Sequence, residues 1–220
     1  MRPYLRNVIY ETKEEKVKIE KKKVLSRISQ IITWLFRFTL VITAIVQAVN
    51  GNMSQLGIIA VTFVLTFYRG LLRKIGKIEI SDVLHCMIIL FMFGTQYLGT
   101  ILDVYGKIPL WDALLHGLSG ILFFYIALTL IKEIEKRTNT KTNFVISMLL
   151  AFCFVLSIGV VWELFEFCMD KFFSQNMQRT LGEIGQNAII DTMSDLFAAT
   201  IGAILATIIE IYKMKRRKKK

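Results

Sequence analysis

Two carboxylates three residues apart, Glu163 and Glu166, interrupt an apolar stretch of the chain. Between residues 143 and 169 the only other strongly polar side chains are Ser147 and Ser157, and the stretch is long enough to cross a bilayer as a helix. The spacing puts both carboxylates on one helical face. Because an acidic residue at the centre of a membrane helix costs roughly 2.5–3.5 kcal/mol, this pair predicts a functional site.

Two further pairs of ionisable residues have helical spacing. Asp112 and His116 lie four residues apart near the start of one apolar run, and Asp191 and Asp195 have the same spacing at the start of another. Residues at this spacing share a helical face. We call the members of the three pairs the acidic cluster: Asp112, His116, Glu163, Glu166, Asp191 and Asp195.

The elements that position these residues are predicted to be membrane helices. Hydrophobic residues make up 54% of the chain and its mean hydropathy is +0.51, which is too apolar for an ordinary soluble domain. Six apolar runs each have about the length of a spanning helix: 28–50, 53–72, 82–104, 109–131, 143–169 and 188–212. We predict an all-α polytopic protein with one six-helix membrane domain, 28–212, between a mixed-charge N-terminal segment, 1–27, and a basic tail, 213–220.

The basic residues alternate from one connection to the next. Nine lie before residue 28, four in 69–77, four in 132–141 and seven in 213–220, whereas the other three connections hold only three in all. The positive-inside rule therefore predicts that both termini face the cytoplasm. The net charge of +11 then reflects topology and attraction to anionic membrane lipids, and we do not expect nucleic-acid binding.

This topology places the acidic cluster at one depth. Its members lie at the start of an inward-running helix, near the end of an outward-running one, and at the start of the next inward-running one. At 1.5 Å per residue, all of them should lie within about 10 Å of the outer surface. We therefore predict a single polar cavity in the outer leaflet. Five further residues are expected to support it: Gln96, Tyr97, Asp103, Trp162 and Arg179.

Carboxylates and an imidazole are suitable ligands for Mg²⁺, Mn²⁺ or Zn²⁺. The cluster divides into expected metal ligands, Glu163, Asp191 and Asp195, and expected catalytic residues, Asp112, His116 and Glu166. In this interpretation Asp112 orients His116, which acts as a general base. Without a metal, the crowded carboxylates would share protons, which suits acid–base chemistry or a proton-coupled pathway. A purely structural alternative is a set of buried hydrogen bonds and ion pairs capped by Arg179.

Small residues near the cluster predict close helix packing. Gly117 and Gly120 follow His116 within the same predicted span. In the last span Ala198, Gly202 and Ala206 are spaced four residues apart, below Asp195. Stripes of this kind let membrane helices approach closely, so each of these helices should pack tightly against a neighbour.

From about residue 82 to residue 206 the sequence resembles the YjdF-like family of bacterial inner-membrane proteins. The resemblance rests on Gly94-Thr95-Gln96-Tyr97, on the segments 111–116 and 162–166, and on 191–195 with Gly202-Ala203. More distantly it is similar to the VanZ-like proteins, which are linked to glycopeptide resistance and the cell envelope. Five cluster members follow the VanZ-like order, and Glu166 stands where that pattern has Gln. The resemblance implies a multi-pass protein of the bacterial plasma membrane with a shared site, and it supplies no reaction.

The depth of the cluster favours metal-dependent processing of a lipid or lipid-linked envelope precursor, because a substrate with an acyl or prenyl tail could enter laterally. A proton- or cation-coupled transporter and a membrane scaffold are the alternatives. Against transport, the inner halves of the spans hold little charge, chiefly Arg37, Asp82 and His85, and no inverted repeat is visible. A lone helical histidine such as His85 is more often a packed residue than a ligand.

Overall fold

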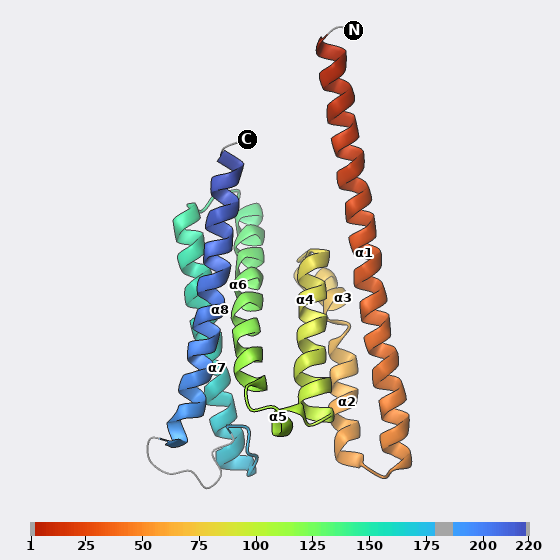
Figure 1. Ribbon diagram of the computed structural model, residues 1–220, viewed down its shortest axis with the longest axis vertical. Helices are drawn as coiled ribbons and strands as arrows, with labels where there is room; N and C mark the ends of the chain where they lie inside the picture. The colour runs from red at the N-terminus through yellow and green to blue at the C-terminus, as the bar shows by residue number, and fades with distance from the viewer. Residues whose placement is uncertain (1–2, 179–186, 219–220) are drawn as a thin grey trace. The chain divides into compact units, whose positions relative to one another are not determined.

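A computed structural model describes residues 3–178 and 187–218. Throughout these ranges the regular structure is helical and no β-strand occurs, which confirms the all-α prediction (Figure 1). The chain forms two compact units, Met1–Leu90 and Phe91–Lys220. We describe each unit by itself.

The first unit contains one long helix and a bent pair of shorter ones. Its elements are α1 (Pro3–Val49), α2 (Met53–Leu65), α3 (Tyr68–Leu71), the π-helical turn η1 (Leu72–Gly76) and most of α4 (Asp82–Met92). A turn joins α1 to α2, and there Gly51 has a φ of +74°, a conformation that glycine adopts without strain. Helix α1 continues without a break across residues 27 and 28, where the sequence predicted a boundary.

The second predicted span is bent by 42° between α2 and α3. At the bend the backbone N–H of Gly70 bonds to the carbonyl of Phe67, so the carbonyl of Thr66 loses its helical partner. Arg37 of α1 replaces that partner. Its Nη2 donates to the Thr66 carbonyl at 3.1 Å, its Nε donates to the Thr66 hydroxyl at 2.9 Å, and its guanidinium lies 3.8 Å from the centre of the Phe67 ring.

Substituting Arg37→Gln should therefore destabilise the protein by about 1–3 kcal/mol, because a carbonyl at a helix break is left without its charged donor. The measurement is thermal or denaturant unfolding of the purified protein in detergent. Arg73→Gln is the matched control, because Arg73 is exposed in η1. Equal stability of the two variants would contradict a role for Arg37 at the bend.

The second unit is built on three long helices. Its elements are the π-helical segment η2 (Phe93–Ile101), which continues from α4, then α5 (Val104–Lys107), α6 (Trp111–Thr138), α7 (Phe144–Phe173) and α8 (Asn187–Lys218). In Figure 1 α6 and α8 run in the same direction and α7 runs in the opposite one. The start of α6, the end of α7 and the start of α8 therefore meet at one end of the unit, the lower end in this view.

Helices α6 and α8 are in backbone contact through glycines. A Cβ added at Gly120 would overlap the backbone carbonyl of Ala199, and one added at Gly202 would overlap the carbonyl of Gly117. The close packing expected from the small residues is thus present. Beside this contact lies a core of buried residues from all three long helices: Phe124, Ala127, Leu128, Met148, Ala151, Val155, Ala199, Ala203 and Ala206.

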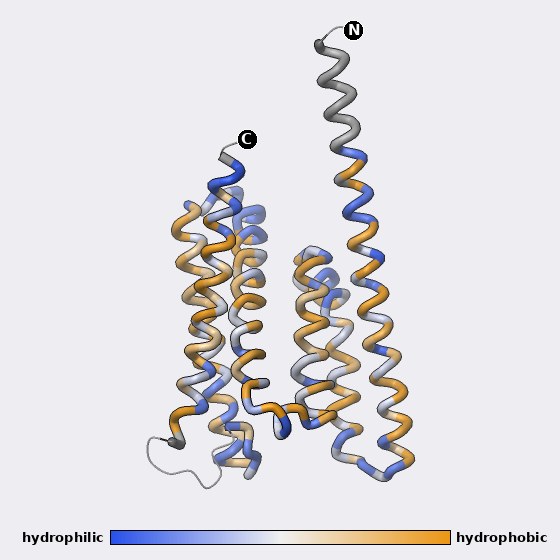
Figure 2. Tube along the Cα trace, in the orientation of Figure 1, coloured by the Kyte–Doolittle hydropathy of each residue, from blue (hydrophilic) through white to orange (hydrophobic). Residues whose placement is uncertain are grey.

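The surface of the helices is that of a multi-pass membrane protein. Large apolar side chains such as Trp34, Val161 and Phe197 are more than 60% exposed. Apolar residues dominate the central turns of α6, α7 and α8, and hydrophilic residues gather toward their ends (Figure 2). Among the described residues five helices are long and apolar enough to span a membrane, or six if the bent pair forms one span. The orientation of the termini and the division at 27/28 and 212/213 stay predictions.

Candidate functional site

The acidic cluster lies where the three long helices of the second unit meet. Asp112 is in the first turn of α6, Glu163 and Glu166 are near the end of α7, and Asp195 follows Asp191 near the start of α8. The exposed fractions of Asp195, Glu163 and Glu166 are 2%, 5% and 7%. The side chains of His116 and Asp112 are 13% and 14% exposed. All six members of the cluster therefore lie at one end of one unit, as the sequence predicted.

Three members of the cluster form a group suited to a metal ion. His116 Nε2 lies 3.7 Å from Asp112 Oδ1 and 3.6 Å from Asp195 Oδ2. One ligand atom from each of the three residues lies within 4.8 Å of the others. These separations are longer than hydrogen bonds. Ligands that hold a divalent cation at about 2.1 Å stand roughly 3–3.5 Å apart, so small movements would close this group around a cation.

The remaining carboxylates surround this group. Glu163 acts electrostatically on Asp191 and Asp112, and Glu166 acts on the same two residues and on Glu163. Asp195 acts on all four of the other acidic side chains. Five carboxyl groups are thus brought together from α6, α7 and α8, and His116 lies within ion-pair distance of two of them, Asp112 and Asp195.

Some of the buried carboxylate oxygens are unsatisfied. Within residues 3–178 and 187–218, neither oxygen of Glu163 has a hydrogen-bond partner, and the same holds for Asp195 Oδ2. The hydroxyl of Thr192 lies beside Glu163 without reaching hydrogen-bond geometry. A buried charge without partners is costly, so these oxygens indicate a site that is completed by a ligand or by protons.

The structure places the expected supporting residues differently from one another. Trp162 contacts the acidic cluster, because its indole Nε1 donates to Glu166 Oε1 at 2.8 Å. Gln96 and Tyr97 lie in η2, which packs against α6 where Gly94 meets Leu115.

Asp103 precedes α5 with a left-handed φ of 55°, and its carboxylate lies against Gly106, so it shapes this turn. Arg179 lies outside the described residues.

Two residues near the cluster were not predicted as part of the site. The indole Nε1 of Trp111 is buried and has no hydrogen-bond partner among the described residues. Thr192 accepts a hydrogen bond from the Gln178 side chain at 2.9 Å, which ties the segment after α7 to the start of α8. Both adjoin cluster members in the sequence, at Asp112 and Asp191, and that adjacency is the only signal that could have found them.

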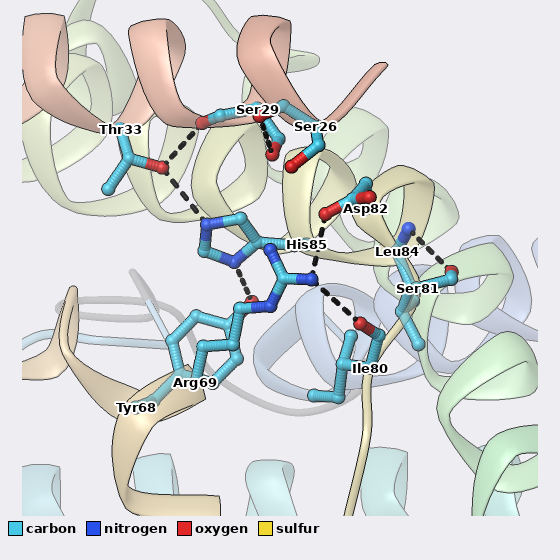
Figure 3. Close-up of polar contacts among 10 residues, drawn as sticks. All are labelled: Ser26, Ser29, Thr33, Tyr68, Arg69, Ile80, Ser81, Asp82, Leu84 and His85. Atoms are coloured by element: carbon cyan, nitrogen blue, oxygen red, sulfur yellow. Dashed lines mark hydrogen bonds and ion pairs between the residues drawn. The ribbon is translucent and has the colours of Figure 1, made fainter. Parts of the chain in front are cut away.

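A second polar network, in the first unit, contrasts with the cluster because its hydrogen bonds are complete (Figure 3). The hydroxyl of Thr33 donates to the carbonyl of Ser29 at 2.7 Å, so it accepts from His85 Nε2–H at 3.0 Å. His85 Nδ1 then accepts from the Tyr68 hydroxyl at 2.6 Å. His85 is 5% exposed and links α1, α3 and α4. It is a packed residue, as its isolation in the sequence predicted.

The ion pair beside His85 is also supported by hydrogen bonds. Arg69 Nη2 donates to Asp82 Oδ1 at 2.7 Å and to the carbonyl of Ile80 at 3.1 Å. The charge on Asp82 is therefore matched by its neighbour on α3. Of the two polar networks, only the acidic cluster has buried oxygens that need a further partner.

The fold and the cluster define a multi-pass membrane protein with a buried group of aspartate, glutamate and histidine side chains. A model of a family described as "Predicted membrane protein (DUF2238)" matches residues 32–216, and the chain belongs to this family. A protein of Thermotoga maritima described as "Uncharacterized protein" is 31% identical over 134 residues. That match covers 59% of this chain and 62% of the relative. No solved structure matches the chain.

Proposed function

We propose that Asp112, His116 and Asp195 bind a divalent cation, and that the protein uses it to process a lipid or lipid-linked envelope precursor. The observation that carries this proposal is the group of one imidazole and two carboxylates, in which the buried Asp195 Oδ2 has no hydrogen-bond partner among the described residues. A cation bound there would offset the repulsion among the carboxylates. A ligand set of one imidazole and two carboxylates suits Mn²⁺ or Zn²⁺.

The geometry modifies the roles expected from the sequence. Asp195 keeps its expected role as a ligand, and His116 and Asp112 join it, because their ligand atoms lie together. Glu166 is then the proposed general base, since the Trp162 indole holds one of its oxygens and so fixes its orientation. A cation bound to the three ligands would supply Lewis acidity toward an anionic head group.

Access for a lipid substrate is supported by the surface of α7. Trp162 and Phe165 are 43% and 45% exposed, and their ring centres lie 5.4 Å apart. An acyl or prenyl tail could lie against these rings while its head group meets the carboxylates of the same helix. The positive-inside pattern would place this end of the unit in the outer leaflet of a bacterial plasma membrane. The distant VanZ-like resemblance, to proteins linked to the cell envelope, is in keeping with an envelope substrate.

Complementation of a deletion strain tests this function. If deletion alters sensitivity to envelope-directed antibiotics, wild-type protein should restore it, and Asp195→Asn and His116→Gln should not. Glu133→Gln is the control and should restore sensitivity fully, because Glu133 pairs with Arg137 near the other end of α6. Expression in the membrane is checked for every variant. Full complementation by Asp195→Asn would overturn the proposal.

A further inference from the structure

One cation at Asp112, His116 and Asp195 leaves much of the cluster's charge unbalanced. The cluster contains five carboxylates. One divalent cation offsets two negative charges, so five ionised carboxylates exceed what it can neutralise. The rest of that charge must be balanced by other side chains, by protons or by a second cation.

Glu163 is the carboxylate most in need of a further partner. It is 5% exposed, and neither of its oxygens has a hydrogen-bond partner in the described part of the chain. Asp191, on the neighbouring helix α8, is close enough for its charge to act on Glu163. Asp191 lies one helical turn before Asp195, which already belongs to the first group. A cation bound between Glu163 and Asp191 would thus adjoin the first site.

We propose that Glu163 and Asp191 bind a second divalent cation beside the first, which makes the acidic cluster a two-cation centre. This proposal rests on the proposed function, because it takes the first cation as given. The two positions differ in chemistry. The first offers an imidazole, whereas the second offers only carboxylates, with the Thr192 hydroxyl nearby. A site of one or two carboxylates completed by water is characteristic of Mg²⁺, and Mn²⁺ also accepts oxygen ligands.

A two-cation centre extends the chemistry available to the site. In two-metal enzymes the ions clamp the attacking and the leaving oxygen of a displacement at phosphorus or carbon. The expected ligand class therefore narrows to a head group that presents at least two oxygens, such as a phosphate or pyrophosphate ester on a lipid tail. Glu166, held by Trp162, stays outside both ligand sets and keeps its proposed role as base.

Manganese titration of the purified full-length protein in detergent tests the second site. Bound Mn²⁺ is measured by equilibrium dialysis with metal analysis, and the spacing of the ions by electron paramagnetic resonance. We expect two Mn²⁺ per wild-type chain with a spin-coupled spectrum. Glu163→Gln should retain one Mn²⁺ with an uncoupled six-line spectrum, and so should Asp112→Asn, which removes a ligand of the first site instead. The control Glu133→Gln should bind two.

The outcomes separate the two proposals. One Mn²⁺ per wild-type chain, unchanged in Glu163→Gln, would overturn the second site and leave the first in place. Two Mn²⁺ in both wild type and Glu163→Gln would also overturn the assignment to Glu163. No bound Mn²⁺ in wild type would overturn both proposals. Size-exclusion profiles identify any variant that has not folded, and because the two single variants affect different helices, one folded variant is sufficient for the test.

Discussion

Gly120→Ala should push α6 and α8 apart and weaken the whole second unit. The added methyl group would overlap the backbone carbonyl of Ala199, which cannot move aside by a change of rotamer. Overpacking of this kind costs about 1–3 kcal/mol, and a clash with backbone belongs at the upper end of that range. Gly202→Ala should behave alike, because its methyl group would overlap the carbonyl of Gly117. Unfolding of each variant in detergent measures the loss.

Gly120→Ala should also impair cation binding, because His116 and Asp195 lie on α6 and α8, the two helices that the substitution pushes apart. We expect at least a tenfold weaker affinity for Mn²⁺ in Gly120→Ala. Gly57→Ala in α2 is the matched control, because a Cβ placed there has no described atom within 4 Å apart from its chain neighbours and the backbone of its own helix. Alanine favours helix over glycine, so this control should be neutral or slightly stabilising. A neutral Gly120→Ala would contradict the backbone contact.

Glu163→Gln should change the stability of the protein in opposite directions with and without divalent cations. In chelator the variant should be more stable than wild type by about 1–3 kcal/mol, because it removes a buried charge that has no partner. With Mn²⁺ at one thousand times its dissociation constant, each filled site adds about 4.1 kcal/mol to the free energy of unfolding, which exceeds this advantage. The variant lacks one site, so wild type should then be the more stable protein.

Thermal unfolding in detergent, with chelator and with Mn²⁺, measures this reversal. Glu133→Gln is the control, because the exposed pair with Arg137 contributes at most about 1 kcal/mol in either condition. If Glu163→Gln were more stable than wild type under both conditions, Glu163 would hold no cation. If it were less stable in chelator, Glu163 would have a partner that completes its hydrogen bonds without metal.

Much of the fold could be predicted because a membrane helix must satisfy its backbone internally and display apolar side chains over a fixed length. The bend at Thr66 could not. No proline marks it, Gly70 lies beyond it within α3, and the residue that stabilises it, Arg37, lies 29 residues earlier in the chain. The π-helical segment η2 likewise has no sequence signal, although it contains Gln96 and Tyr97.

The sequence could predict which residues lie together in the candidate site, because the rise per residue of a helix fixes how deep each one lies in the membrane. Direction and spacing were enough to place three pairs of ionisable residues at one end of the second unit. The division of roles within the cluster depends on the rotation of α6 relative to α8. The contact between Gly120 and Ala199 sets that rotation, and it brings His116 toward Asp195. Sequence spacing does not encode this angle, so the expected ligand set of Glu163, Asp191 and Asp195 lacked His116.

The apolar character of α7 also has a consequence for biosynthesis. Ribosomes deliver α7 to the insertion machinery before α8, so Glu163 and Glu166 enter the bilayer while Asp195 is still unmade. Of the five candidate spans α7 has the highest mean hydropathy, yet only 22% of that span is buried. Packing inside the unit therefore accounts for only a small part of this apolar surface. The apolar residues of α7 also offset the cost of the two glutamates at the moment of insertion, before α8 and the proposed ligand Asp195 are made.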